Sequence, residues 1–486
     1  MNESIYLLKP EKLWYYFAEV LKIPRPSKKE EKIVDYLKNF GDRHKLETIL
    51  DAVGNVVIRK PGSPGLQNAP SVCLQGHVDM VCEKDADIDH DFDKDPIQTY
   101  IEDGWLKARG TTLGADNGIA VATMLALLEA KDIVHGPLEC LFTVDEETGL
   151  TGAFGLDPTM LKSRILLNLD SEDDGEFFIG CAGGKDTVIE LPVSKEDIPL
   201  GYVTLRLKVS GLQGGHSGDD IHRNRGNANK ILNRFLWETA GKYGIRISFF
   251  EGGNLRNAIA REATGIFLVP AGHLRSVKSF AEQYLKDLRF EFRVSEPDLK
   301  IELEEFETPG FVLSKSLQDN LLNSLYACPH GVMAWSQDIP GFVETSTNLA
   351  SVKMQNGKIR IATSQRSSIE SAKDDICNMV ASVFRLTGAH IEHSDGYPGW
   401  APNPNSQVLE LCVKSYEDLF GQKPVVRAIH AGLECGLIGD KYPGMDMISY
   451  GPTMRGVHSP TERLEISTVE KFWVLTLDLL QKIARQ

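Results

Sequence analysis

Apolar residues in the first part of the chain alternate between helical spacing and short continuous runs. Helical spacing predicts one helix over residues 10–21 and a second that begins at a capping box formed by Ser27 and Glu30. Short apolar runs predict four strands, at residues 56–58, 71–74, 138–143 and 165–169. A helical pattern over residues 118–129 lies between the second and the third of these strands. This alternation predicts an α/β sheet with helices on its faces.

The middle of the chain has a different pattern, in which strands and helices are less regularly interleaved. Strands are predicted at residues 203–209, 245–250, 263–269 and 358–362, and helices near residues 229–239 and 276–286. A loop rich in Pro and Gly at residues 394–405 marks a boundary, after which a helix is predicted over residues 408–420. The last helix is predicted to be capped by Ser467, with Glu470 three residues on. The middle therefore indicates an α+β domain.

Composition narrows the class of protein. With 486 residues, 42% hydrophobic and 25% charged, the chain is typical of a globular protein of two to three domains. Its 53 Lys and Arg against 68 Asp and Glu give a net charge of -15, and no basic run relieves it, so nucleic acid is excluded as a partner. Eight cysteines without a Cys-x-x-Cys pair indicate a reducing compartment. The lack of a signal peptide and of a long apolar run predicts a cytoplasmic protein without a membrane partner.

Five short segments carry His, Asp and Glu at the ends of predicted strands or in the loops that follow. The segments are residues 75–79, 114–118, 144–149, 167–170 and 456–460. In open α/β sheets ligands are held at the carboxyl ends of the strands, so polar residues concentrated there indicate a binding site.

Each of these residues also fits a simpler role when it is taken alone. His77 and Asp79 can be a metal ligand with its hydrogen-bonding carboxylate, or a solvated loop histidine beside an acid. Asp116 precedes a predicted helix, so it can be an N-cap, although a carboxylate also has two oxygens that can bridge two cations. The adjacent acids Glu146 and Glu147 can be solvated charges, or they can divide metal binding and proton transfer between them.

Asp170 ends an apolar strand and could simply begin a turn, and His458 lies in a loop flanked by Gly and Pro. Together, however, the segments supply two histidines and three carboxylates as ligands, a nitrogen and oxygen set that suits paired Zn²⁺ or Mn²⁺. The sequence contains no Gly-x-Ser-x-Gly elbow, P-loop or Gly-x-Gly-x-x-Gly pattern. A serine hydrolase, an NTPase and a dinucleotide-binding enzyme are therefore not indicated.

The order and spacing of these segments resemble the M20 family of di-zinc metallopeptidases over nearly the full chain. The likeness is strongest to its aminoacyl-histidine dipeptidase (Xaa-His dipeptidase) branch. The matching segments are Leu74-Gln-Gly-His-Val-Asp-Met-Val81, Thr112-Leu-Gly-Ala-Asp-Asn-Gly118, Gly214-Gly-His-Ser-Gly218, Arg225-Gly-Asn-Ala-Asn229 and His430-Ala-Gly-Leu-Glu-Cys-Gly436.

The resemblance implies a fold and a set of ligands. Residues 1–186 and 398–486 would form a di-metal aminopeptidase-like catalytic domain, with a central mixed sheet flanked by helices, and residues 187–397 an inserted α+β lid domain. The cofactors would be two divalent cations per chain, zinc in the first place, with manganese or cobalt possible. The implied ligands are Asp116 as the bridge, His77 and Asp170 at one ion, and Glu147 and His458 at the other.

The resemblance also implies the chemistry and the substrate contacts. Glu146 would be the general base and Asp79 would orient His77, in a metallodipeptidase acting on Xaa-His dipeptides that include β-Ala-His. In the lid, His216 would stabilise the oxyanion, and Asn257 and Arg366 would bind the substrate's carboxylate. An amidohydrolase acting on N-acyl amino acids and a catalytically silent metal- or peptide-binding protein remain as alternatives, and a homodimer is expected. The sequence leaves the role of Glu434 open.

Overall fold

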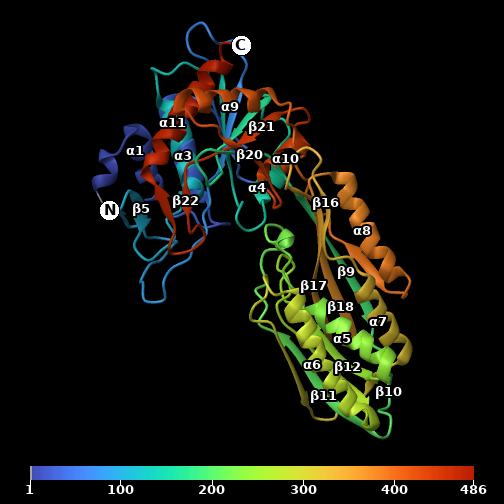
Figure 1. The fold of residues 1–486 in the computed structure, drawn as a ribbon. Coiled ribbons are helices and arrows are strands. Elements are labelled where there is room, and N and C mark those ends of the chain that lie inside the picture. The colour runs from blue at the N-terminus through green and yellow to red at the C-terminus, as the bar shows by residue number, and fades with distance from the viewer. Residues whose placement is uncertain (1–2) are drawn as a thin grey trace. The chain divides into compact units, whose positions relative to one another are not determined.

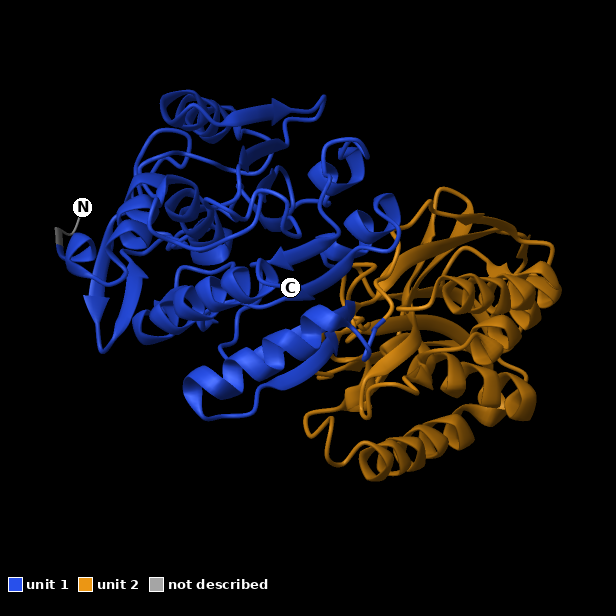
Figure 2. Ribbon diagram, turned by 90° about the horizontal axis from the view of Figure 1, so that it is seen from above, with its two compact units in different colours: residues 1–180, 402–428, 433–486 blue, residues 181–401, 429–432 orange. Residues whose placement is uncertain are grey.

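The computed structural model describes residues 3–486, which form two compact units. Unit 1 comprises Met1–Gly180, Pro402–Ala428 and Leu433–Gln486, and unit 2 comprises Cys181–Ala401 and Ile429–Gly432 (Figure 2). Unit 2 is therefore inserted in the sequence of unit 1, as the fold class predicts. Over the described residues, no helix combines the length and the apolar character that a membrane span requires.

Unit 1 is built around an eight-stranded mixed sheet. Its strands, in spatial order, are β1 (Glu47–Leu50), β2 (Val56–Lys60), β6 (Leu138–Thr143), β3 (Val72–His77), β7 (Ile165–Asn168), β21 (Asp446–Ser449), β8 (Glu176–Cys181) and β20 (Val425–Ile429). β6, β3, β7 and β21 run parallel to one another. β2 pairs antiparallel with both of its neighbours, β1 and β6. The central parallel strands are buried along their length, which explains their continuous apolar runs in the sequence.

Helices flank this sheet, as predicted (Figure 1). They are α1 (Glu11–Val20), α2 (Glu31–His44), α3 (Ala115–Glu129), α4 (Thr151–Gly155), α9 (Gln407–Phe420), α10 (Glu434–Lys441) and α11 (Ile466–Ile483). A four-stranded sheet of β22 (Met454–Arg455), β23 (Arg463–Glu465), β5 (Trp105–Ala108) and β4 (Thr99–Glu102) completes the unit. α3 packs between α1 and β3 and is buried over nearly its whole surface, because its sequence is apolar on every side.

Both predicted helix caps are wrong. α2 begins at Glu31 without a side-chain cap, because the Ser27 hydroxyl instead donates to Oδ2 of Asp79 at 2.8 Å, and Glu30 accepts the backbone N–H of Asp145 at 3.0 Å. α11 begins at Ile466, one residue before the predicted cap, and the hydroxyl of Ser467 donates to the Glu465 side chain. At α2, the side chains of Ser27 and Glu30 are therefore occupied by the Asp79 carboxylate and the Asp145 backbone amide, and neither is available to cap the helix.

Unit 2 is an α+β unit with a nine-stranded antiparallel sheet. The order is β14 (Lys300–Glu305), β11 (Tyr202–Ser210), β13 (Ala263–Pro270), β12 (Arg246–Gly252), β17 (Val343–Gln355), β18 (Lys358–Ser367), β9 (Gly183–Pro192) and β19 (His390–His393), with β16 (Gly331–Trp335) also paired to β17. The short strands β10 (Lys195–Glu196) and β15 (Val312–Leu313) pair separately. Its helices are α5 (Ala228–Tyr243), α6 (Leu274–Glu291), α7 (Lys315–Ala327) and α8 (Glu370–Arg385).

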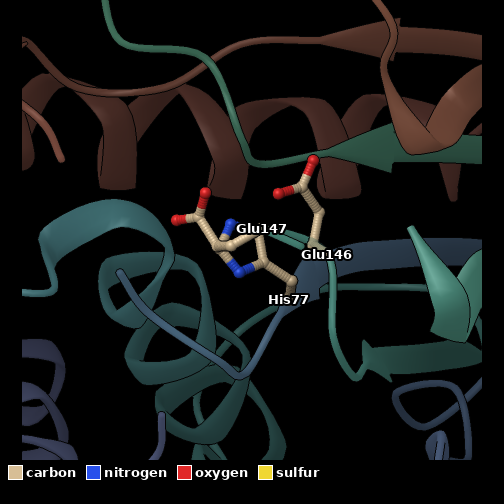
Figure 3. Close-up of side chains that lie close together, drawn as sticks. All are labelled: His77, Glu146 and Glu147. Carbon is tan, nitrogen blue, oxygen red and sulfur yellow. The ribbon is translucent and has the colours of Figure 1, made fainter. Parts of the chain in front are cut away.

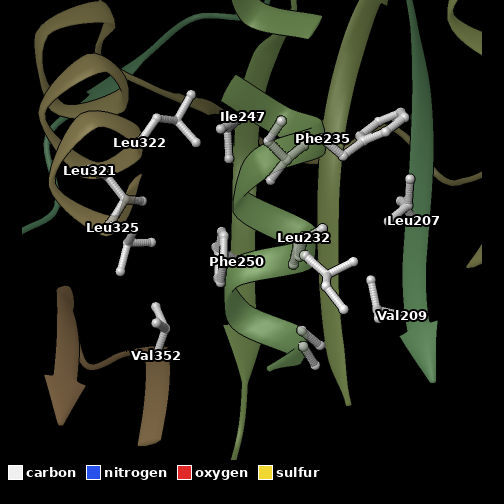
Figure 4. Packing of buried hydrophobic residues seen from close by; sticks show 14 of the residues in the cluster. Leu207, Val209, Leu232, Phe235, Ile247, Phe250, Leu321, Leu322, Leu325 and Val352 are labelled. Carbon is white, nitrogen blue, oxygen red and sulfur yellow. The ribbon is translucent and has the colours of Figure 1, made fainter. Parts of the chain in front are cut away.

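The core of unit 2 lies between this sheet and its helices (Figure 4). Leu232 and Phe235 of α5 are buried in one cluster with Leu207 of β11 and Phe250 of β12. β17 was not predicted, because Ser, Thr and Asn make up much of its sequence. Several of its buried polar side chains have partners distant in sequence, as where Gln365 donates to the hydroxyl of Thr347 at 3.1 Å and Asn348 donates to the carbonyl of Ala258 at 2.8 Å.

Candidate metal centre

The polar segments predicted at strand ends meet at one edge of the unit 1 sheet. His77 is the last residue of β3, Asp170 follows β7, and Glu146 and Glu147 follow β6. Because these three strands are parallel neighbours, their carboxyl ends lie together. His458 joins them from the loop between β22 and β23, near the C-terminal end of the chain.

Asp116 lies between the two histidines. Its Oδ1 is 3.0 Å from Nε2 of His77 and its Oδ2 is 3.1 Å from Nε2 of His458. The N-cap position of α3 is Gly114, and regular helical dihedral angles begin only at Gly118, so the simpler reading of Asp116 as an N-cap is wrong. The two carboxylate oxygens are thus divided between two imidazole nitrogens, which is the arrangement that a bridging ligand requires.

Two trios of ligand atoms share Asp116. His77, Asp116 and Asp170 form one, and Asp116, Glu147 and His458 form the other, each with its ligand atoms within 4.8 Å of one another. Nε2 of His77 lies 3.5 Å from Oδ1 of Asp170, and Nε2 of His458 lies 3.0 Å from Oε2 of Glu147. The His77 side chain is 1% exposed and that of His458 is 49% exposed, so the centre opens to solvent on the His458 side.

Glu146 lies beside both trios on the same loop as Glu147. Figure 3 shows these two side chains leaving consecutive positions of the loop next to the His77 ring. Burial raises the pKa of the Glu146 carboxyl well above its ordinary value, and the negative charges of Asp170, Glu434 and Glu147 add to this rise against the opposing effect of His77.

The charges of the cluster favour a cation. Burial raises the pKa of Asp170 to about 6, whereas hydrogen bonds with Asp116 and Glu147 raise the pKa of His458 to about 11. Oε1 of Glu147 is buried without a hydrogen-bond partner among the described residues. Crowded carboxylates with an unused oxygen and two imidazoles are a donor set that fits divalent ions such as Zn²⁺.

Asp79 supports this centre from behind. Its Oδ1 lies 3.3 Å from Nδ1 of His77, whose ring also approaches the Asp79 backbone carbonyl oxygen at 3.2 Å. The same carboxylate accepts the backbone N–H groups of Glu146 at 3.0 Å and Glu147 at 3.2 Å. Burial opposes ionisation of Asp79, but the contact with His77 prevails and lowers its pKa to about 2. Asp79 therefore links the orientation of the His77 ring to that of the glutamate loop.

The three residues predicted to contact substrate all lie in unit 2. Nη2 of Arg366, on β18, is 3.4 Å from Nε2 of His216, and its Nη1 donates to the Tyr397 hydroxyl at 2.9 Å. Asn257 has an exposed side chain, and its backbone carbonyl accepts the N–H of Ser217 at 2.7 Å. Unit 2 thus brings His216 and Arg366 together and connects Asn257 to their segment through the backbone.

Two further polar side chains lie at the centre: Asn117, to which the sequence analysis assigned no role, and Glu434, whose role it left open. The Asn117 amide donates to Oδ1 of Asp170 and, at 3.1 Å, to the backbone carbonyl of Leu169. Glu434, at the start of α10, is buried and accepts hydrogen bonds from Gln75 at 2.6 Å and Thr143 at 2.8 Å, and burial raises its pKa to about 7. The contacts of Glu434 are far apart in sequence, so no local pattern indicates them.

Comparisons with known proteins agree with this geometry. The model of peptidase family M20/M25/M40 matches residues 73–482. The cytosol non-specific dipeptidase of Escherichia coli is 44% identical over 476 residues, which cover 98% of both chains. The crystal structure of aminoacylhistidine dipeptidase from Vibrio alginolyticus has a TM-score of 0.94 at 44% identity and covers 98% of each chain.

A more distant structure, aminopeptidase PepT from Bacillus cereus, has a TM-score of 0.57 at 16% identity over 98% of this chain and 100% of its own, and so shares the fold. An α/β unit with an inserted α+β unit and a cluster of His, Asp and Glu at the strand ends is the architecture that the resemblance to the M20 family implied. The chain belongs to peptidase family M20, as its sequence predicts. The structure named aminoacylhistidine dipeptidase, at 44% identity over 98% of the chain, confirms the likeness to the aminoacyl-histidine dipeptidase branch.

Proposed function

We propose that this chain is a two-cation metallodipeptidase whose centre is the cluster at the strand ends of unit 1. The observation that carries the two-ion proposal is the division of the Asp116 oxygens between His77 and His458 at 3.0 and 3.1 Å. The dipeptidase activity rests on relatives named as dipeptidases that are 44% identical over 98% of the chain.

The ligands are assigned as two sets that share one bridge. His77 and Asp170 hold one ion, Glu147 and His458 hold the other, and Asp116 binds both. Zinc suits this nitrogen and oxygen set, and manganese or cobalt are the alternatives. When bound, such ions lower the pKa of water and polarise the carbonyl of the scissile peptide bond.

Proton transfer is assigned to Glu146. Its carboxylate accepts a proton from the attacking water and later delivers it to the leaving amine, so one residue acts first as base and then as acid. Asp79 holds the tautomer of His77 through the contact with Nδ1, which leaves Nε2 free as a ligand atom. Its two hydrogen bonds from the glutamate loop fix the position from which Glu146 acts.

The substrate is proposed to be a dipeptide of the Xaa-His type, including β-Ala-His. His216 acts as a donor to the developing oxyanion, and Arg366 and Asn257 bind the substrate's C-terminal carboxylate. Arg366 suits this task because a guanidinium matches a carboxylate with two parallel hydrogen bonds. The Escherichia coli relative is named a non-specific dipeptidase. The preference of this chain for His at the C-terminal position of the dipeptide is therefore to be measured.

Location and assembly are further proposals. A cytoplasmic location is supported by the name of the Escherichia coli relative, a cytosol dipeptidase. A homodimer is proposed from the family resemblance, and light scattering of the purified protein tests it.

The deciding experiment measures metal content per chain together with hydrolysis of β-Ala-His, Gly-His, Ala-Ala and N-acetyl-His. We expect about two divalent ions per chain, with activity on the free dipeptides that is lost to a chelator and restored by Zn²⁺. Faster hydrolysis of N-acetyl-His than of any dipeptide would replace the proposal with a deacylase. A single ion per chain at full activity would remove the bridging role of Asp116.

A further inference from the structure

Glu462 makes an unusual set of contacts close to the metal centre. It is only 2% exposed and accepts four consecutive backbone N–H groups from the loop that begins α3. Its Oε2 accepts those of Leu113 at 2.7 Å and Gly114 at 3.0 Å, and its Oε1 accepts those of Ala115 at 2.8 Å and Asp116 at 3.3 Å. The side chain therefore binds the main chain of the very segment that carries the bridging carboxylate.

This arrangement depends on the conformation of Gly114. Its φ of 68° lies in the left-handed region, which helps to turn successive N–H groups toward one side of the loop. A side chain at this position would also meet Nη2 of Arg25, which lies 2.6 Å from the place of its Cβ. The glycine thus permits both the amide concavity that receives Glu462 and the close approach of Arg25.

Arg25 holds the opposite face of the same loop. It is 1% exposed and donates to the backbone carbonyl of Gly114. It also donates to the carbonyls of Val78 at 2.9 Å and Asp79 at 2.8 Å, which follow the ligand His77. The loop is therefore held by two buried side chains: Glu462 accepts hydrogen bonds from its backbone N–H groups, and Arg25 donates a hydrogen bond to the backbone carbonyl of Gly114.

Glu462 also belongs to the segment that carries His458. The loop between β22 and β23 contains both residues, and the N–H of Glu462 donates to the carbonyl of Ser459 at 3.0 Å. Within residues 3–486, Glu462 has no Lys, Arg or His partner in an ion pair, so its four charge-assisted amide contacts are what hold it. It is the side chain that ties the His458 loop to the Asp116 loop.

We propose that Glu462 is a positioning residue that sets the separation of Asp116 and His458 and thereby the affinity of the ion assigned to Asp116, Glu147 and His458. This inference rests on the proposed two-cation centre. It predicts an unequal effect, because His77 and Asp170 are held by β3 and β7 of the central sheet, whereas His458 lies in a loop and depends on Glu462 for its distance from Asp116.

The test compares Zn²⁺ binding to the full-length protein and its variants by competition with a chromophoric chelator. Glu462→Gln keeps the size of the side chain but turns an NH₂ group toward backbone donors. We expect one of the two Zn²⁺ sites to lose about 10 to 100-fold in affinity, as loss of such supporting contacts does elsewhere, while the other site changes less than about threefold. Glu462→Asp, which keeps four acceptor positions, restores part of the loss.

The control is Glu465→Gln, three residues further on, where the carboxylate accepts the Ser467 hydroxyl and lies outside the loop contact. We expect wild-type affinity at both sites. Thermal unfolding of the metal-free variants separates a positioning role from general damage to the fold. A positioning residue changes the affinity of one metal site and leaves the unfolding temperature close to that of the wild type, whereas damage to the fold lowers the unfolding temperature and weakens both sites.

Several outcomes would overturn the inference. Wild-type affinity at both sites in Glu462→Gln would show that the clamp does not matter for the ions. Equal weakening of both sites with a large drop in the unfolding temperature would make Glu462 a purely structural residue. Two ions in the wild type with either of these results would leave the proposed function intact, whereas fewer than two ions in the wild type would remove both.

Discussion

Nε2 of His458 lies 3.0 Å from Oε2 of Glu147, although one residue follows the sixth strand and the other lies near the end of the chain. Within residues 3–486, the ion pairs of His458 are with Asp116 and Glu147, and the adjacent Glu146 forms none with it. Two adjacent acids of the same type therefore have different surroundings, and this difference can be tested.

Glu146→Gln should keep both ions and the fold but lose turnover by about 10² to 10⁴-fold, because an amide cannot accept a proton. Glu147→Gln should instead lose metal, since an amide is a poor replacement for a carboxylate ligand. Metal analysis and kcat, measured on the same samples, check both expectations. Metal loss in the first variant and not in the second would exchange the two roles.

Asp116→Ala should remove most of both ions, because its two oxygens face the two histidines. The expected metal content falls from about two ions per chain toward zero, with activity lost in parallel. Asp173→Asn is the control, since Asp173 pairs with Arg455 at the surface. Retention of one tightly bound ion and of activity in Asp116→Ala would show that Asp116 does not bridge.

Arg366→Lys should raise KM for dipeptides, because an ammonium group cannot reproduce the two parallel hydrogen bonds of a guanidinium. Amidation of the dipeptide's C-terminus should cause a similar loss in the wild type and little further loss in the variant. Steady-state kinetics on the free and amidated substrates check this. Equal hydrolysis of both substrates by the wild type would exclude the carboxylate contact.

His216→Ala should lower kcat by roughly 10² to 10³-fold, as removal of an oxyanion donor does in other hydrolases. His222→Ala, at a nearby exposed position, is the control and should keep kcat. The measurement is kcat at saturating dipeptide with both metal sites filled. An unchanged kcat in His216→Ala would leave that histidine as an ordinary turn residue.

The loss of folding stability at acid pH should depend on His430, a buried histidine of unit 2 that contacts the Ser346 hydroxyl at 2.7 Å. Burial, with Arg366 nearby, lowers the pKa of His430 to about 3 from its ordinary value of 6.5. The unfolded chain therefore binds the proton first, so this stability is complete above pH 6.5 and is lost as the pH falls toward 3.

Between pH 7 and pH 4.5 this single group accounts for roughly 2 to 3 kcal/mol of the free energy of unfolding. In His430→Gln, urea unfolding of the metal-free protein should show a correspondingly smaller drop over the same pH range. His390→Gln, at an exposed position, is the control and should follow the wild type. An identical drop in His430→Gln would show that His430 is already protonated in the folded state.

Local patterns predicted strands β2, β3, β6 and β7 of the central sheet and the longer helices of unit 1, because those strands are continuously apolar and those helices carry regular apolar spacing, whereas the shorter and edge strands were not predicted. They failed at Ser27 and Ser467, where a serine followed three residues later by a glutamate fits a capping box but the hydroxyl has a different partner. They also failed at β17, where buried polar side chains such as Thr347 and Asn348 find their partners only in the folded unit. The predicted limits of the lid at residues 187 and 397 stay a prediction.

His77, Asp116, Glu147 and Asp170 could be named as candidate ligands because each stands next to a strand or helix signal, whereas His458 lies in a loop; the ligand roles themselves came from the family resemblance. Glu462 was not named, and the role of Glu434 was left open, since Glu462 binds backbone N–H groups of residues 113–116 and Glu434 binds Gln75 and Thr143. The partners lie 346 to 349 positions from Glu462 and 359 and 291 positions from Glu434 in the sequence. Such contacts exist only after the two ends of the chain have met.

The return of the chain to unit 1 after the inserted unit fixes the order in which the centre is made on the ribosome. His77, Asp116, Glu147 and Asp170 emerge early, whereas His458 follows only after the whole of unit 2 has been translated. A nascent chain thus carries a carboxylate-rich half of the centre for most of its synthesis. A polypeptide that stopped just before position 458 would contain the whole of the inserted unit and still lack the second imidazole of the proposed centre, so activity requires translation to continue beyond that unit.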